Sequence, residues 1–167
     1  MAETRAWIGL GSNLDSPLDQ VRAALTELAA LPDTRLAACS RLYRSAPMGP
    51  PGQPDYINAV AGVDTGLPPQ ALLDALQAIE RAHGRVRGEH WGPRTLDLDI
   101  LLYGDLKLDS PRLHLPHPGL LARNFVLVPL AELAPGLMLD GVSVAGRAAR
   151  LGRAGLEVAA PAPGVAA

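Results

Sequence analysis

Residues 91–102 read Trp91-Gly92-Pro93-Arg94-Thr95-Leu96-Asp97-Leu98-Asp99-Ile100-Leu101-Leu102, a basic loop that runs into a strand-like segment. Successive side chains on a β-strand point to opposite sides, so Asp97 and Asp99 are expected on one face. The apolar side chains around them are expected in a core: Leu96, Leu98, Ile100 and Leu102. Two residues along a strand span roughly 6.6 Å, and two-metal sites hold cations about 3.5–4 Å apart. Since Mg²⁺ is usually held by one or two carboxylates plus substrate phosphates, the stretch predicts a Mg²⁺–nucleotide site.

The residues just before the two carboxylates strengthen this interpretation. Acidic pairs on half-exposed strands are usually only solvated, so the pair alone is a weak signal. Three arginines precede it, with His90 and Trp91 among them: Arg85, Arg87 and Arg94. The whole chain carries 15 basic and 17 acidic residues, a formal net charge of −2. A local basic cluster in such a chain favours a compact polyanion such as a metal-bound triphosphate, whereas nucleic acid would favour a broader basic stripe and a high pI.

The composition is typical of one globular domain. The chain has 167 residues, of which 48% are hydrophobic and 19% charged, enough for a sizeable core. We expect a single domain over residues 1–152 and a loosely held Ala/Pro-rich tail over residues 153–167. The first residues show no signal-peptide pattern and no apolar run reaches membrane-spanning length, so we expect a cytoplasmic protein. The lone Cys39 can form no internal disulfide and is expected to be a small buried hydrophobic residue.

The hydrophobic pattern predicts four strands and two main helices. Apolar and polar side chains alternate in four segments, which we expect to be strands: residues 5–10, 36–45, 56–65 and 94–103. Helical spacing of apolar residues follows Ser16-Pro17 and Pro68-Pro69, and a shorter helix is expected over 124–133. The order βαββαβ predicts an α+β, ferredoxin-like antiparallel sheet with both helices on one face, followed by C-terminal short helices.

This topology leaves the second face of the sheet to loops or a ligand. Four polar or aromatic side chains are expected to look out there: Tyr56, Asn58, Asp97 and Asp99. A Pro/Gly-rich loop over residues 46–54 and a glycine-bearing, basic loop over residues 84–93 could close on a ligand bound at that face.

Common phosphate-binding and zinc-binding motifs are absent from the sequence. Leu14 stands where a dinucleotide fingerprint that begins at Gly9 requires its third glycine, and no Gly-x4-Gly-Lys-Ser/Thr run occurs. No Cys and His residues stand at zinc-site spacing. His114 and His117 lie in a Pro-rich segment, where histidines more often make polar loop contacts than bind metal. Contact with a phosphate would suit His117 better than metal ligation.

Four groups of residues follow one another in a characteristic order. In chain order they are Gly9-Leu10-Gly11-Ser12-Asn13, Tyr43-Arg44-Ser45 with Gln53-Pro54-Asp55-Tyr56-Ile57-Asn58, residues 91–100, and Pro116-His117 with Arg123 and Phe125. Together they resemble the 6-hydroxymethyl-7,8-dihydropterin pyrophosphokinase family, over about residues 5 to 135. The resemblance implies an ATP-dependent diphosphotransferase that moves pyrophosphate from ATP to the pterin hydroxymethyl group and releases AMP, in tetrahydrofolate biosynthesis.

The resemblance also implies a role for individual residues. Asp97 and Asp99 would hold two Mg²⁺ ions, and Arg85 and Arg94 would be the phosphate-binding and catalytic arginines. The residues expected near ATP are Gln77, Glu80, Arg87, Trp91, Ile100, Arg112, His114, His117 and Arg123. The residues expected around the pterin are Ser45, Ala46, Met48, Tyr56, Asn58, Trp91 and Phe125. The pterin would stack between Tyr56 and Phe125, its edge would be read by Asn58, and Trp91 would close over it.

The sequence departs from the family pattern in two places, and two alternative functions stay open. His90 stands where arginine is frequent in the family, in a loop one residue shorter than in some relatives, and Pro118 stands where some relatives have an aromatic residue. A non-catalytic ferredoxin-like module that senses a small ligand would also explain the fold. An RNA-binding domain is disfavoured because the strands lack the aromatic pattern and the net charge is negative. We expect a monomer whose partners are ATP and hydroxymethyldihydropterin, with no nucleic acid and no membrane.

Overall fold

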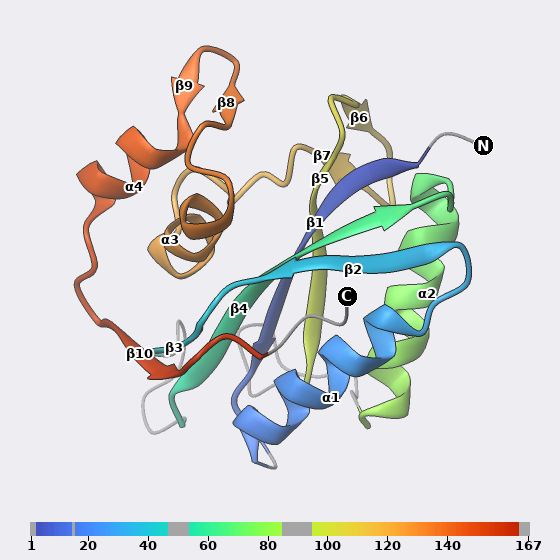
Figure 1. Ribbon diagram of the computed structural model, residues 1–167, viewed down its shortest axis with the longest axis horizontal. Coiled ribbons are helices and arrows are strands. Elements are labelled where there is room, and N and C mark those ends of the chain that lie inside the picture. Colours follow the sequence, from blue (N-terminus) through green and yellow to red (C-terminus); the bar gives the residue numbers. More distant parts are fainter. Residues whose placement is uncertain (1–2, 15, 47–53, 85–94, 164–167) are drawn as a thin grey trace.

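The computed structural model describes residues 3–14, 16–46, 54–84 and 95–163 and has a central antiparallel sheet with helices on both faces (Figure 1). The sheet order is β10-β3-β4-β1-β5, and β2 also pairs with β4. These strands are β1 (Thr4–Ser12), β2 (Thr34–Cys39), β3 (Leu42–Ser45), β4 (Tyr56–Thr65), β5 (Asp97–Tyr103) and β10 (Leu156–Ala160). Every strand pair in the sheet is antiparallel, so the predicted ferredoxin-like order is confirmed.

The second predicted strand is divided into β2 and β3 at Ser40. The backbone N–H of Ser40 donates to the Val60 carbonyl at 2.9 Å, and the Val60 N–H donates to the Ser40 hydroxyl oxygen at 2.9 Å. The Ser40 hydroxyl oxygen therefore replaces a backbone carbonyl as the acceptor of the Val60 N–H. The strand is interrupted here, and pairing with β4 resumes in β3. A local hydrogen bond of this kind competes with the regular ladder.

Helices α1 (Pro17–Ala29) and α2 (Pro69–Ala82) pack on one face of the sheet, as predicted. Each begins with a proline, whose missing N–H costs nothing in the first turn. The buried side chains of α1 recur at helical spacing, at Val21, Ala24, Leu25 and Leu28. They meet the inward side chains of the strands, including Ile8, Ile57, Leu98 and Ile100. Burial of this face stabilises the layer, by about 1.5–3 kcal/mol for each large apolar side chain.

Helices α3 (Asn124–Leu133) and α4 (Val144–Leu151) cover part of the opposite face, beside the small hairpin of β8 (Met138–Leu139) and β9 (Val142–Ser143) (Figure 1). The short helix predicted over residues 124–133 is confirmed. A second core lies beneath these helices and contains Trp7, Tyr43, Val60, Leu101 and Leu102. The expectation that only loops or a ligand cover this face is therefore wrong for the part around Trp7.

Leu102 lies on the face opposite to the one predicted. The register between β1 and β5 shifts between Trp7 and Ile8, which pair with Leu102 and Ile100, so Leu101 is an extra residue. A bulge of one residue reverses the alternation beyond it. Leu101 and Leu102 therefore both join the core beneath α3 and α4, whereas Leu98 and Ile100 stay in the core of α1 and α2.

The C-terminal segment is also more ordered than predicted. Residues Leu156–Ala160 form β10, which pairs with β3 so that Leu156 lies opposite Ser45 and Glu157 opposite Arg44. An ion pair of 3.2 Å joins Arg44 to Glu157. The prediction of a loosely held tail is therefore wrong for these residues, because the uncovered edge of β3 supplies a partner for them. Among the described residues, no helix combines the length and apolar character needed to cross a membrane.

Candidate active site on the open part of the sheet

Asp97 and Asp99 lie on the same face of β5, as the alternation predicts. The strand alternates between half-buried Asp97, buried Leu98 and exposed Asp99. The residues opposite the two carboxylates on β1 are Gly11 and Gly9. Glycine has no side chain, so the groups nearest to the Cβ positions of Gly9 and Gly11 come from other residues. Leu101 Cδ2 lies 3.3 Å from the Cβ position of Gly9. The structure therefore presents two carboxylates on one face, opposite two residues without side chains.

Gly11 separates Asp97 from Asn58 in one row across three strands. It pairs with Asp97 on β5 and with Asn58 on β4. A Cβ atom on Gly11 would lie 3.3 Å from Asn58 Oδ1 and 3.7 Å from Tyr56 Cδ1, so these side chains reach over the glycine. Neighbouring strands are about 4.8 Å apart, which puts the outer two strands of this row roughly 10 Å apart. The row thus places an amide and a carboxylate on one face of the sheet, on the two strands that flank Gly11.

The amide of Asn58 is buried and held in place by Ser45. Asn58 Nδ2 donates to Ser45 Oγ at 2.6 Å, and both side chains are buried. This bond assigns the amide orientation and leaves Oδ1 as the atom nearest the glycine. Tyr56 lies opposite Ser45 in register and is half-buried. The structure therefore brings together three of the predicted pterin residues.

The remaining predicted pterin residues are less closely defined. Ala46 follows Ser45 and is exposed, and Phe125 lies half-buried in the first turn of α3. Met48 and Trp91 lie outside the described residues, as do Arg85, Arg87, His90 and Arg94. Their predicted roles stay predictions.

His117, Arg123 and Asp99 are electrostatic neighbours. Burial lowers the pKa of His117 below 6.5, the Asp99 carboxylate opposes this effect, and the Arg123 guanidinium adds to it. The His117 backbone N–H donates to the Leu101 carbonyl at 2.9 Å, which ties this segment to β5. The Gly119 N–H donates to His117 Nδ1 at 3.0 Å. Since Nδ1 accepts, the ring proton lies on Nε2, which can donate to an anion.

Arg112 and Gln77 lie together on the outer side of α2. Arg112 Nη2 donates to Gln77 Oε1 at 3.1 Å and to Asp74 Oδ1 at 2.7 Å, and Nη1 donates to Gln70 Oε1 at 3.3 Å. Asp74 is a contact that the sequence analysis missed. Its position three residues before Gln77 on one helix face is the signal that could have revealed it.

Three other residues predicted near ATP lie elsewhere in the fold. Ile100 is only 2% exposed and points into the core of α1 and α2, so its side chain lies on the face opposite to Asp99. His114 lies exposed on β7 (His114–Leu115), next to β6 (Leu108–Asp109), and its Nδ1 is 2.6 Å from Asp109 Oδ1. Glu80 is buried beneath β5, where Oε2 accepts from the Leu98 N–H at 2.8 Å.

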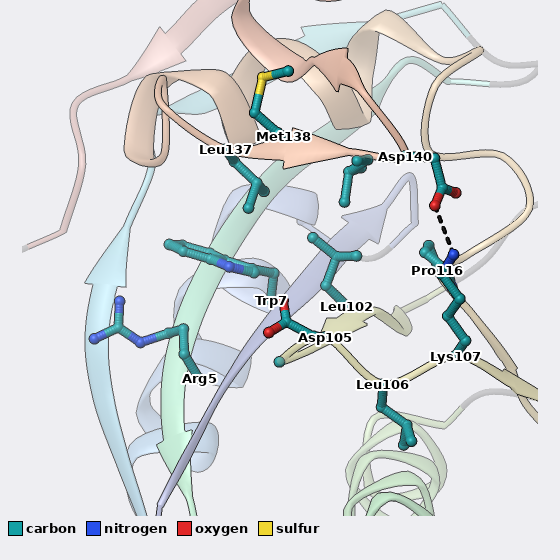
Figure 2. A pocket seen from close by; sticks show the side chains of 12 residues that line it. Arg5, Trp7, Leu102, Asp105, Leu106, Lys107, Pro116, Leu137, Met138 and Asp140 are labelled. Atoms are coloured by element: carbon teal, nitrogen blue, oxygen red, sulfur yellow. Dashed lines mark hydrogen bonds and ion pairs between the residues drawn. The ribbon is translucent and has the colours of Figure 1, made fainter.

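A cavity of about 380 Å³ lies at the other end of β1 and β5 (Figure 2). Its floor is formed by Trp7 and Leu102, and the β8–β9 hairpin with Leu137 forms one wall. The Lys107–Asp140 ion pair of 2.7 Å stands at one side of it. None of the predicted site residues that the structure describes lines this cavity, which is therefore separate from Asp97, Asp99, Tyr56 and Asn58.

The described part of the chain contains no group of three or more His, Cys, Asp or Glu side chains placed to hold a metal ion. A cation at Asp97 and Asp99 would therefore need further ligands from a substrate. Phosphate oxygens are the ordinary partners of carboxylates around Mg²⁺.

Comparison with known proteins relates this chain to one enzyme family. The model of the family described as 7,8-dihydro-6-hydroxymethylpterin-pyrophosphokinase matches residues 7–135. A 2-amino-4-hydroxy-6-hydroxymethyldihydropteridine pyrophosphokinase of Pseudomonas aeruginosa is 59% identical over 138 residues, 82% of this chain and 85% of that protein. The protein of the same name from Haemophilus influenzae is 52% identical over 139 residues, 83% and 87% of the two chains.

A solved structure supports the fold. The crystal structure of Plasmodium falciparum HPPK-DHPS wild type with SDX-DHP aligns with a TM-score of 0.67 and 13% identity. The match covers 88% of this chain and 43% of that longer chain. At this identity the likeness concerns the fold alone.

Proposed function

We propose that this chain, which belongs to the 7,8-dihydro-6-hydroxymethylpterin-pyrophosphokinase family, transfers pyrophosphate from ATP to the hydroxymethyl group of 6-hydroxymethyl-7,8-dihydropterin. The products are AMP and the pterin diphosphate, an intermediate of tetrahydrofolate biosynthesis. The observation that supports this most is the row in which Gly11 separates the Asn58 amide from the Asp97 carboxylate. One side of the row suits the edge of a heterocycle, and the other suits a metal-bound phosphate chain.

The pterin would lie on the Asn58 side of the row. Asn58 Oδ1 is a hydrogen-bond acceptor on a buried side chain. Leaving a buried acceptor without a hydrogen bond is unfavourable, so this position favours a ligand edge that carries N–H groups. Tyr56 offers an aromatic surface next to it, and Phe125 would supply the second. The exposed carboxylate of Asp99 stands on the other side.

Asp97 and Asp99 would hold Mg²⁺, two ions by the family resemblance. The donor set fits this hard cation, since both ligands are carboxylate oxygens on one face and β1 places only glycines opposite them. When bound, Mg²⁺ would offset the negative charge of the triphosphate and orient it.

Three described side chains would contact the nucleotide. His117 presents an Nε2–H, and the Arg123 guanidinium is one of its charged neighbours; both would donate to phosphate oxygens. Arg112, which donates to Asp74 and Gln77 of α2, would contact the nucleotide from beside this helix. Arg85, Arg87 and Arg94 would add positive charge, as the sequence predicts.

The chemistry then depends on position and charge. The pterin hydroxymethyl oxygen forms a bond to the β-phosphorus, the bond from the β-phosphorus to the bridging oxygen of the α-phosphate breaks, and AMP leaves with that oxygen. The hydroxyl proton is released to solvent, and no residue is assigned as its first acceptor. Holding the two substrates in line and offsetting the charge on the transferred group would together supply the rate enhancement. We propose that the chain works as a monomer.

An assay of AMP formation tests this function. AMP should appear only with hydroxymethyldihydropterin, ATP and Mg²⁺ together. Asp97→Ala and Asp99→Ala should lower the rate about a hundredfold or more, roughly 3 kcal/mol of transition-state stabilisation, with an unchanged melting temperature. Asp105 is an exposed carboxylate that lines the cavity at the other end of β1 and β5. Asp105→Ala is the matched control and should retain full activity. ADP as the product, or full activity in Asp97→Ala, would contradict the proposal.

Calorimetric titration separates this enzyme from a non-catalytic binding module. The enzyme should bind an unreactive ATP analogue in a Mg²⁺-dependent manner, and that binding should be lost in Asp99→Ala. A sensor module without the metal site would bind the analogue equally well with and without Mg²⁺, or not at all.

A further inference from the structure

Glu80 is a buried carboxylate that lies on the side of the sheet opposite to Asp97 and Asp99. It belongs to the last turns of α2 and is 5% exposed. Burial of a carboxylate is unfavourable unless hydrogen bonds compensate for the lost water. Glu80 Oε2 accepts one such bond from the backbone N–H of Leu98, at 2.8 Å. The Glu80 carboxylate thus binds the backbone of Leu98, the residue between Asp97 and Asp99.

The position of β5 explains why this N–H needs a side chain as its partner. Among the described residues, β5 is the last strand in the sheet order, and β1 pairs with it along one edge. In an antiparallel pair, alternate residues point their N–H groups toward the partner strand and away from it. The Leu98 N–H points away from β1, since it is bonded to Glu80, and the flanking Asp97 and Asp99 lie opposite glycines of β1.

Three interactions hold Leu98 in place. The Leu98 side chain is 4% exposed in the core of α1 and α2, β1 pairs with the strand on one edge, and Glu80 binds it from the other. A carboxylate ligand acts well only when its backbone holds it in one place, because catalytic geometry tolerates small errors only.

We propose that Glu80 is a positioning residue that holds the Asp97-Leu98-Asp99 backbone so that both carboxylates keep their place on the open face. This inference rests on the proposed function of the two aspartates. It differs from the role that the family resemblance implies, a direct contact with ATP. Glu80 acts here through the backbone, from the opposite side of the strand.

Amide hydrogen exchange tests the proposal in the free protein, without ATP or metal. The Leu98 amide should exchange about tenfold faster or more in Glu80→Ala than in the wild type. Glu80→Gln keeps an acceptor oxygen and should retain most of the protection. Arg81→Ala, the next residue on α2 and exposed, is the control and should leave the Leu98 amide unchanged.

Kinetics provide the second readout. In Glu80→Ala, kcat should fall about tenfold and the Mg²⁺ concentration for half-maximal rate should rise, while Glu80→Gln should stay within about threefold of the wild type. A direct ATP contact would instead raise the KM for ATP in Glu80→Ala and leave Leu98 exchange unchanged, and that result would overturn the proposal. The proposal would also be overturned if Glu80→Gln kept the Leu98 amide protected but lost as much activity as Glu80→Ala. In that case the negative charge of Glu80 itself would be required.

Two further outcomes are informative. If Glu80→Ala does not fold, Glu80→Gln alone decides between the two roles by the same comparison of exchange and activity. If Asp97→Ala keeps full activity, the proposed function fails, whereas the exchange of Leu98 still reports whether Glu80 holds the strand. The two failures are thereby distinguishable.

Discussion

The guanidinium of Arg123 lies against the backbone of Gly119. A Cβ atom on residue 119 would come within 2.8 Å of Arg123 Nε and 2.9 Å of Cζ, distances that no real Cβ contact allows. The same glycine donates its N–H to His117 Nδ1. One small residue therefore gives room to one proposed phosphate ligand and sets the proton position of another. No pattern in the sequence marks Gly119 for these roles.

Gly119→Ala should displace Arg123 and weaken ATP binding without unfolding the protein. Gly119 is not among the glycines with positive φ, so alanine fits the backbone, and the displaced atoms are the far end of a flexible side chain. We expect kcat/KM for ATP to fall about tenfold, roughly 1.4 kcal/mol. Gly136→Ala, where a Cβ meets nothing within 4 Å, should leave it unchanged. In an Arg123→Ala background the Gly119→Ala change should add no further loss, and an equal loss there would show that Gly119 acts by another route.

Gly11→Val should weaken pterin binding and spare the nucleotide. The new side chain would press on Asn58 Oδ1, 3.3 Å from the Cβ position, and on the Tyr56 ring. We expect the KM for the pterin to rise about tenfold or more, and the Kd of an ATP analogue measured without pterin to change less than about twofold. Gly66→Ala, whose Cβ would make only ordinary contacts, is the control. An unchanged pterin KM would show that the ligand does not use this row.

Glu132→Gln should destabilise the protein at neutral pH more than at acid pH. Glu132 accepts from the Tyr43 hydroxyl, from the Arg41 N–H at 2.8 Å and from Arg41 Nε at 3.0 Å, and so joins α3 to the start of β3. Burial by itself raises the pKa of Glu132, but these hydrogen bonds more than offset it, and the pKa lies below 4.5. A carboxyl with a lowered pKa contributes stability above its unfolded pKa and loses it as the pH falls through the folded one.

Thermal melts of the two proteins check this expectation. The wild type should be more stable than Glu132→Gln by roughly 1–2 kcal/mol at neutral pH, the difference between hydrogen bonds to a charged and to a neutral acceptor. The difference should shrink as the pH falls below 4.5 toward the folded-state pKa. A difference that stays constant over this range would mean that the charge on Glu132 contributes nothing.

Cys39 should not react in the folded protein. The thiol is buried, and burial together with the charge of Glu132 raises its pKa to about 12. Only the thiolate attacks alkylating reagents, so iodoacetamide at about pH 8 should label Cys39 fully in denaturant and negligibly in the native state. Mass spectrometry measures the label, and Cys39→Ala gives the background. Labelling of the native protein at the rate of a free thiol would contradict the burial of this residue.

The sequence by itself determined the layout of the main elements. Alternation with period two predicted the strand of residues 56–65 and the shared face of Asp97 and Asp99, and both agree with the structure. Spacing near 3.6 predicted the buried residues of α1 and α2. These features depend on neighbours along the chain, so local patterns carry them. The motifs around residues 9–13 and 91–100 likewise indicated the family to which the chain belongs.

Only the tertiary structure decided where these patterns fail and what surrounds the candidate site. The bulge that turns Leu102 to the other core, the pairing of residues 156–160 with β3, and the contact from Glu80 to Leu98 all depend on residues that are distant in sequence. Each arises because a backbone group on one strand meets a group from another element. Such complementarity exists only after the layers have packed, and no periodicity along the chain encodes it.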